Sequence, residues 1–361
     1  MSTEKHTRVT LAPGRTGLGD QTSRTIDFLR ELAEPSAPSD QIAAALELAR
    51  TLGVAPTTLT DRWETLATLG AADLALARAA EPHLDARGIL DEAHAAGEIV
   101  PDAAASPAAT WGVFAAEGSP TPLVATAVGD SWSLTGIKPW CSLAGRLDRA
   151  LITARTTDGP RLLFAVDLHH PGVTVPGGTW HSRGLTEIPS GPVEFDVVAA
   201  HAVGSPGWYL ERPGFATGGI GVAACWFGGA VGLARTLFDF CAAAATPSPF
   251  ALMHLGAVDE ALADARRALA EAVSVIEAGT LSSTNGAILA KRVRGTVART
   301  CETVIERTGH ALGPAPLALD PEHAKRVVDL QLYIRQHHAE RDEAGLGEAL
   351  LDARVEGNRP W

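Results

Sequence analysis

The sequence predicts a multidomain α+β protein with an N-terminal helical domain, a central antiparallel β-barrel or sandwich, and a C-terminal four-helix bundle. Three observations predict this fold class. The first hundred residues are rich in alanine and are divided by glycine and proline. Short apolar segments separated by turn residues come next, and long segments with apolar residues at spacings of three and four follow them. This order of helices, strands and helices predicts three folding units.

We divide the 361 residues into five parts where the composition changes. We expect a flexible N-terminus, the helical domain, the β domain, the bundle and a short tail. Their boundaries are 1–20, 21–107, 108–210, 211–355 and 356–361.

Four short helices are expected in the N-terminal domain. Alanine favours helix, and few β-branched residues oppose it. Glycine and proline end helices, and they occur between the four segments. Pro82 falls inside the last segment, where a proline breaks or kinks a helix. The expected helices are residues 22–32, 41–52, 60–69 and 71–96.

The β domain is expected to contain two hairpins and two further strands. The turn residues Gly129-Asp130 separate the strands of the first hairpin, and residues 157–160 separate those of the second. The even spacing of short strands is typical of a sandwich or a small barrel. The expected strands are 123–128, 131–137, 149–156, 161–168, 173–175 and 192–198.

Apolar stripes predict the helices of the bundle. Asp320 is suited to cap the last helix, because Pro321 follows at the first helical position. We expect this helix to continue through His337 and His338. Four long helices indicate a four-helix bundle. The stripes consist of Val258, Leu262, Ala265, Leu269, Ala272 and Ile276, then Val293, Val297, Cys301, Val304 and Thr308, then Val327, Leu330 and Ile334.

Residues 214–234 carry no charge and are about as long as a membrane span. Seven of these residues are glycine, however, and glycine lets neighbouring backbones approach closely. We therefore interpret this segment as a close-packed helix of a soluble bundle and expect no membrane partner.

Charge and cysteine content exclude several classes of protein. The chain has 30 basic and 42 acidic residues, a net charge of −12, whereas nucleic-acid binding requires a basic surface. The four cysteines have no CxxC spacing, which argues against a disulfide scaffold and a zinc finger. No apolar run occurs in the first ten residues. We expect a cytoplasmic protein without a nucleic-acid partner or a bound metal.

Three local patterns are candidates for chemistry. His338 lies four residues before Asp342, so a helix would place the two side chains side by side. A histidine beside a carboxylate can act as a base; the alternative is a histidine at a helix end with its hydrogen bonds satisfied. Trp140 and Ser142 are two residues apart, and in a strand they would share a face that stacks on a flat heterocycle, with core packing as the alternative. The third pattern is Glu81, His83 and Asp85, whose spacing is poor for a single helix face.

Several segments resemble the acyl-CoA dehydrogenase superfamily, in family order over about residues 60 to 347. The run GDSWSLTGIKPWCS at 129–142 resembles the family segment "G-x-x-W/Y-x-L-x-G-x-K-x-W-I-T/S". The run WGVFAAEGS at 111–119 resembles a degraded form of its "T-E-P-x-A-G-S-D" loop. Residues 148–154 resemble the strand that follows, 229–234 the start of the bundle, and 326–329 the "R-D" before the last helix.

The resemblance implies a three-part, FAD-dependent oxidoreductase that oxidises an acyl-CoA-like thioester at its α and β carbons. It implies that Trp140 lies against the flavin and that Ser142 reaches the flavin N5 atom, with Cys141 between them. It further implies a homodimer or homotetramer assembled through the bundle. The remaining residues implied to contact flavin are Phe114, Glu117 and Ser119 of the loop, and Phe250.

The usual catalytic base of the family is a glutamate shortly after the "R-D" pair. Counted from Asp329, that position falls on His337 here, so we predict His337 or the nearby Glu340 as the base. Two alternatives stay open. One is a flavin-dependent monooxygenase on the same scaffold, and the other is a catalytically degenerate homologue acting as a binding or partner subunit.

Overall fold

The computed structural model describes residues 8–12, 17–32, 37–54, 57–98, 100, 108–118, 121–129, 131–156, 159–279 and 281–355. The chain begins with four helices, close to the expected positions. Thr58 caps the third with its hydroxyl and Asp73 caps the fourth with its carboxylate. The fourth helix continues through Pro82, which costs it only one backbone hydrogen bond. These helices are α2 (Asp20–Glu31), α3 (Pro38–Leu52), α4 (Leu59–Ala72) and α5 (Leu74–Ala95).

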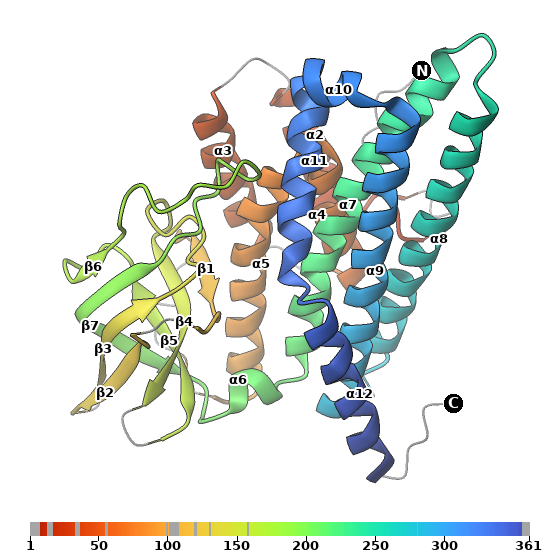
Figure 1. Cartoon of the computed structure of the whole chain (residues 1–361). Helices are drawn as coiled ribbons and strands as arrows, with labels where there is room; N and C mark the ends of the chain where they lie inside the picture. Colours follow the sequence, from red (N-terminus) through yellow and green to blue (C-terminus); the bar gives the residue numbers. More distant parts are fainter. Residues whose placement is uncertain are drawn as a thin grey trace.

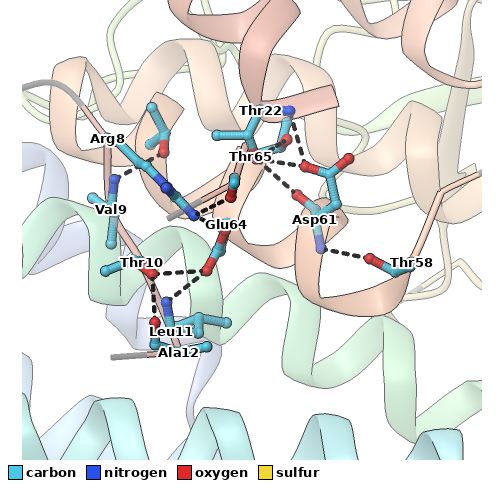
Figure 2. A network of polar contacts seen from close by, with 12 residues as sticks. Arg8, Val9, Thr10, Leu11, Ala12, Thr22, Thr58, Asp61, Glu64 and Thr65 are labelled. Atoms are coloured by element: carbon cyan, nitrogen blue, oxygen red, sulfur yellow. Dashed lines mark hydrogen bonds and ion pairs between the residues drawn. The ribbon is translucent and has the colours of Figure 1, made fainter. Parts of the chain in front are cut away.

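Residues 8–12 are packed on α4, although we expected them within a flexible N-terminus. Val9 and Leu11 are buried in the core. The fully buried Glu64 carboxylate accepts hydrogen bonds from the Arg8 guanidinium, the Thr10 hydroxyl and the Leu11 backbone N–H at 2.9–3.1 Å (Figure 2). The network fixes this segment because each of these donors would otherwise be desolvated without a partner.

A second acid of α4 caps another helix. The Asp61 carboxylate accepts the backbone N–H groups of Gln21 and Thr22, in the first turn of α2, at 2.9 and 3.0 Å. Figure 2 shows Thr22 beside Asp61. The residue before α2 is Gly19, which has no side chain to cap the helix. Asp61 thus satisfies these N-terminal N–H groups of α2 from a different helix.

The strands form a small closed barrel. β4 pairs with β2 and β5, β5 with β7, β7 with β3, and β3 with β2, which closes the circle. β1 adds to β4 in parallel, and β6 adds to β7. Both expected hairpins are confirmed as antiparallel pairs; residues 130, 157 and 158 of their turns lie outside the described residues. The strands are Trp111–Phe114, Val124–Val128, Ser131–Lys138, Arg149–Thr156, Arg161–Asp167, Val173–Thr174 and Val193–Val203 for β1 to β7.

The C-terminal region is helical. Asp320 accepts hydrogen bonds from the backbone N–H groups of Glu322 and His323, as expected for a cap. The helix does not continue through His337 and His338, however: it ends at Tyr333, and a short 3₁₀ turn and a loop follow. The elements are α6 (Trp208–Glu211), α7 (Gly214–Ala243), α8 (Pro249–Glu277), α9 (Ser283–Leu312), α10 (Pro314–Leu319), α11 (Pro321–Tyr333), η2 (Ile334–Gln336) and α12 (Glu340–Val355).

The uncharged segment is a buried helix, α7. By length and composition α7 is able to cross a membrane, but 72% of its most apolar stretch is buried inside the protein. A Cβ at Gly228 would lie 2.1 Å from the Ala67 carbonyl oxygen, so only glycine lets α7 pack this closely on α4. The interpretation as a close-packed core helix is confirmed.

Helix α5 lies between the barrel and the bundle (Figure 1). It contacts β1 on one side, and α7 and α11 on the other. A site between the barrel and the bundle must therefore use α5 as one of its walls.

Candidate active site

A cavity of about 380 Å³ lies along this boundary. Its size falls within the range of small-molecule sites. Its walls come from α5, from Val113 of β1, from the start of α7, from α9, and from the segment that joins α11 to α12. Lining residues include Arg78, Glu81, Asp85, Arg212, Gly219, Ala287, Ala290, Lys291, Arg294, His338 and Asp342.

Glu81 and Asp85 lie one turn apart on the α5 face toward this cavity. They also line a second cavity of about 190 Å³ between α4, α5 and α7. The Asp85 carboxylate packs on the bare backbone of α7, because a Cβ at Gly218 would lie 2.4 Å from its Oδ1. From the sequence we named both acids but considered their spacing with His83 poor for a single helix face; the separation of four residues between Glu81 and Asp85 was the overlooked signal.

His83, between the two acids in sequence, faces a different direction. It is buried, and its Nδ1 accepts the backbone N–H of Trp111 at 3.1 Å. Burial and the neighbouring Arg87 and Arg50 lower the pKa of His83 to about 4. A neutral, buried imidazole with this partner has a structural role in joining α5 to β1.

Glu81 is a strongly perturbed acid of the cavity. Its carboxylate forms an ion pair with Arg78, Nη1 to Oε2, at 3.2 Å. Burial raises the pKa of Glu81 to about 7, despite the opposing effect of Arg78. A carboxyl group with such a pKa can hold or release a proton at neutral pH.

Arginines balance the acids around the cavity. Arg294 donates to the carbonyl oxygens of Gly219 and Gln336, at 2.6 and 2.8 Å. Its guanidinium also lies 4.7 Å from the centre of the Trp226 ring. Arg212 pairs with Glu92 at 2.6 Å. The cations are therefore held in fixed positions and give the cavity a mixed rather than a purely acidic lining.

Arg78 also connects the cavity to the barrel. Its Nη2 donates to the Ser142 hydroxyl at 2.8 Å, and Ser142 in turn lies 2.7 Å from the Ser190 hydroxyl. Because the Ser190 hydroxyl donates to the Ile188 carbonyl oxygen, its remaining bond must be accepted from Ser142. The Ser142 proton is thus engaged within the barrel.

Trp140 and Ser142 do not share a strand face. β3 ends at Lys138, and Trp140 has a φ of 60°, outside strand geometry. Trp140 is 61% exposed whereas Ser142 is only 5% exposed. The alternation argument was wrong because the chain turns after Lys138. The core-packing alternative for Trp140 is also wrong, since its indole is available on the surface.

The other barrel residues predicted to contact flavin are either buried or line a different cavity. Phe114 is buried in the core, and Cys141 is buried with the pKa of its thiol raised by burial. Glu117 binds the buried ammonium of Lys138 at 3.0 Å and lines a separate cavity of about 290 Å³. Ser119 lies outside the described residues.

The segment joining α11 to α12 divides the predicted base residues between two cavities. His338 lines the main cavity and is 3.6 Å from Asp342. His337 instead lines a smaller cavity of about 120 Å³ between α9 and α12, and burial lowers its pKa. Glu340 is exposed at the start of α12 and lines none of these four cavities.

Phe250, the last predicted flavin residue, is 74% exposed in the first turn of α8 and lines none of the same cavities. Within the described part of the chain, no three His, Cys, Asp or Glu side chains are grouped to hold a metal ion.

Comparison with known proteins identifies solved structures with a similar architecture. No family model and no curated protein matches the sequence. Solved structures do match over nearly the whole chain. KijD3, in complex with FMN and a dTDP-linked amino sugar, has a TM-score of 0.78 at 19% identity, covering 93% of both chains. Dibenzothiophene monooxygenase TdsC from Paenibacillus sp. A11-2 has a TM-score of 0.75 at 18% identity, covering 92% of this chain and 96% of TdsC.

A third structure connects these matches to the predicted family. The steroid ACAD (acyl-CoA dehydrogenase) Tcur3481-Tcur3483 has a TM-score of 0.73 at 18% identity, covering 93% of this chain and 98% of that one. The helical regions and the small barrel of our structure correspond to these proteins. The chain therefore has the acyl-CoA dehydrogenase-like fold, as the sequence resemblance predicted.

Proposed function

We propose that this protein is a flavin-dependent oxidoreductase whose small organic substrate binds in the main cavity. The observation that carries the proposal is this cavity of about 380 Å³ beside Arg78, which joins it to the barrel residue Ser142. Two proteins of the same fold support it: KijD3 is described with FMN and a sugar nucleotide, and TdsC with FMN and indole.

The residues present fit a flavin. The exposed Trp140 indole offers a flat stacking surface two residues from Ser142, which bonds Arg78 of α5. Arg78 offers a fixed cation there, suited to a phosphate or to a carbonyl of the ring. Hydrogen-bond donation from Ser142 to a flavin requires its bond to Ser190 to break. FMN and FAD both remain candidates, since the resemblance implies FAD whereas KijD3 and TdsC are described with FMN.

A bound flavin supplies electron transfer between the substrate and an acceptor such as oxygen. The chain itself positions the substrate and manages protons. Glu81 holds or releases a proton near neutral pH, and Arg78 fixes its orientation. Helices α5, α7 and α9 supply walls of the cavity in which the substrate is held.

We favour a monooxygenase over an acyl-CoA dehydrogenase. Removal of an α-proton from a thioester in the family uses a glutamate in the segment that joins α11 to α12. Here that segment presents His338 to the main cavity, while Glu340 is exposed outside it. TdsC, of the same fold, is named a dibenzothiophene monooxygenase. We expect a dimer or tetramer in either case.

The first test is the visible absorption spectrum after incubation with FMN or FAD and gel filtration. We expect a retained flavin band and, in Trp140→Ala, about tenfold weaker flavin binding from the loss of a stacking surface. Leu319→Ala, which removes a side chain 83% exposed on α10, is the control. No retained flavin in the wild type would favour a degenerate homologue, or an enzyme that takes reduced flavin from solution.

A second test separates the two chemistries. Flavin bleaching by acyl-CoAs under anaerobic conditions would contradict the monooxygenase. Product formation that requires NADH, a flavin reductase and oxygen would support it.

The paired variants His338→Ala and His337→Ala assign the residues between α11 and α12. Because His338 lines the main cavity, we expect His338→Ala to lower turnover about a hundredfold. We expect His337→Ala to retain most activity. The reverse order would return the predicted role to His337, and Glu340→Gln tests the remaining candidate. Circular dichroism of each variant verifies folding.

A further inference from the structure

Glu81 separates two cavities rather than closing one. It lines the main cavity on one side and the 190 Å³ cavity between α4, α5 and α7 on the other. Asp85, Arg212 and Gly218 also border both. Glu81 therefore borders the proposed substrate site and also a second, separate cavity.

One oxygen of Glu81 is available to a ligand. Among the described residues, Arg78 is the sole hydrogen-bond donor to this carboxylate, and it contacts Oε2. Arg78 is itself held by Ser142, so it fixes the carboxylate without covering Oε1. Oε1 is not one of the buried side-chain atoms without a partner, so it is accessible from the cavity, where it can accept a hydrogen bond from a ligand that supplies a donor.

The charges around Glu81 keep it poised between its two protonation states. Burial raises its pKa and Arg78 lowers it; Asp85 raises it and Arg294 lowers it. The result, about 7, allows the carboxylate to gain or lose a proton under ordinary conditions. The other titratable and charged groups facing this part of the cavities are Arg62 of α4, Glu92 of α5, Tyr209, Arg212, Cys225 of α7, Tyr333 of α11, Lys291, His338 and Asp342.

We propose that the substrate carries an O–H or N–H group that donates to Glu81 Oε1, and that Glu81 takes this proton during turnover. The inference rests on the proposed function, because it assigns the main cavity to the substrate. In this step the O–H or N–H bond of the substrate breaks and an O–H bond forms on Glu81. The electron pair stays on the substrate oxygen or nitrogen, which makes the substrate easier to oxidise.

The second cavity provides the route by which the proton leaves. Its volume of about 190 Å³ is enough for several water molecules. Arg62, Asp85 and Glu92 supply polar groups along it. Glu81 can thus return to its ionised form through water on its far side, without moving the proton back past the substrate.

The test compares phenol, which has an O–H donor, with anisole, in which a methyl group replaces that hydrogen. Calorimetric titration of the full chain at pH 8, where Glu81 is ionised, should show roughly tenfold preference for phenol. At pH 6, where Glu81 is protonated, the preference should fall below about threefold. In Glu81→Gln the preference for phenol over anisole should be small at both pH values, because the amide is uncharged at both.

Two further variants complete the test. Glu81→Asp keeps a carboxylate, so its preference for phenol should still depend on pH. This variant tests the proposal if Glu81→Gln does not fold. Glu271→Gln, an exposed change on α8, should bind like the wild type. Equal binding of phenol and anisole by the wild type, or an unchanged preference in Glu81→Gln, would overturn the proposal. Flavin retention, read by absorbance on the same samples, reports separately on the proposed function.

Discussion

Helices α4 and α5 each carry a pair of inward-facing acids, and the two pairs are partnered very differently. The Asp61 and Glu64 carboxylates of α4 accept bonds from backbone N–H groups, hydroxyls and a guanidinium. On α5, Glu81 has one described donor, and Asp85 has none among the described residues. Only the α5 pair borders cavities large enough for a ligand.

This difference in hydrogen-bond partners distinguishes acids that hold segments of the fold together from acids that can take part in binding or catalysis. A carboxylate surrounded by donors is held ionised in one position, and it fixes the segments that supply those donors. A carboxylate with few donors retains the capacity to bind a ligand or a proton. Burial alone does not distinguish the pairs, because Glu64 and Glu81 are both buried.

The largest expected effect comes from removing the best-partnered acid. Glu64→Ala leaves Arg8, Thr10 and Leu11 without their buried acceptor and should lower the free energy of unfolding by about 3 kcal/mol. At pH 7, Glu81→Ala loses one ion pair and should change the free energy of unfolding by less than about 1 kcal/mol. Urea unfolding of both variants measures the contrast. Similar losses would mean that the two acids do not differ in role.

The pH dependence of stability should isolate Glu81. Its pKa in the folded protein, about 7, lies above the ordinary value, so the folded state binds the proton more tightly than the unfolded chain. The resulting stabilisation is complete below about pH 4 and is lost as the pH rises through 7. The difference in unfolding free energy between wild type and Glu81→Gln should change by about 2–3 kcal/mol between pH 5 and 8.

His83 has the opposite pH dependence, and it is present in both proteins. Its lowered pKa contributes stability above about pH 6.5 that is lost as the pH falls through 4. Because this contribution is common to wild type and Glu81→Gln, it cancels in their difference. A difference that stays flat with pH would contradict the assignment to Glu81.

The smallest expected change in stability concerns the two aspartates, Asp61 of α4 and Asp85 of α5. Asp61→Asn weakens the cap of α2 and should cost about 1 kcal/mol, with faster hydrogen exchange at the Gln21 and Thr22 amides. Asp85→Asn should change stability by less than about 0.5 kcal/mol or raise it, since burial raises the pKa of this carboxyl. Thermal unfolding together with amide exchange compares the two, and protected α2 amides in Asp61→Asn would contradict the capping role.

Local chemistry allowed much of the fold to be predicted from the sequence. Alternating strands and their turn residues located both hairpins, and the cap at Asp320 located the start of α11. The glycines of α7 correctly indicated close packing, as Gly228 against Ala67 shows. These features depend on residues close together in sequence, or on a single property such as the absence of a side chain.

The site was less predictable because it depends on distant segments. The chain leaves strand geometry after Lys138, before Trp140, and α11 ends at Tyr333. The spacing of apolar residues in the sequence indicated neither of these two ends. Glu81 was named from the sequence, but its position between two cavities depends on α4, α7 and α9, and no residue near it in sequence indicates those walls. We considered the spacing of Glu81, His83 and Asp85 poor for one helix face, although Glu81 and Asp85 alone lie one turn apart on α5.

The walls of the main cavity differ in how easily they can be changed. The side from α5 is held by ion pairs and hydrogen bonds, but α9 contributes the small side chains of Ala287 and Ala290. Larger apolar residues at these two positions would narrow the cavity without removing a hydrogen bond. Substrate scope could therefore be redesigned, or diversify in evolution, through α9, while the proton-handling residues of α5 stay as they are.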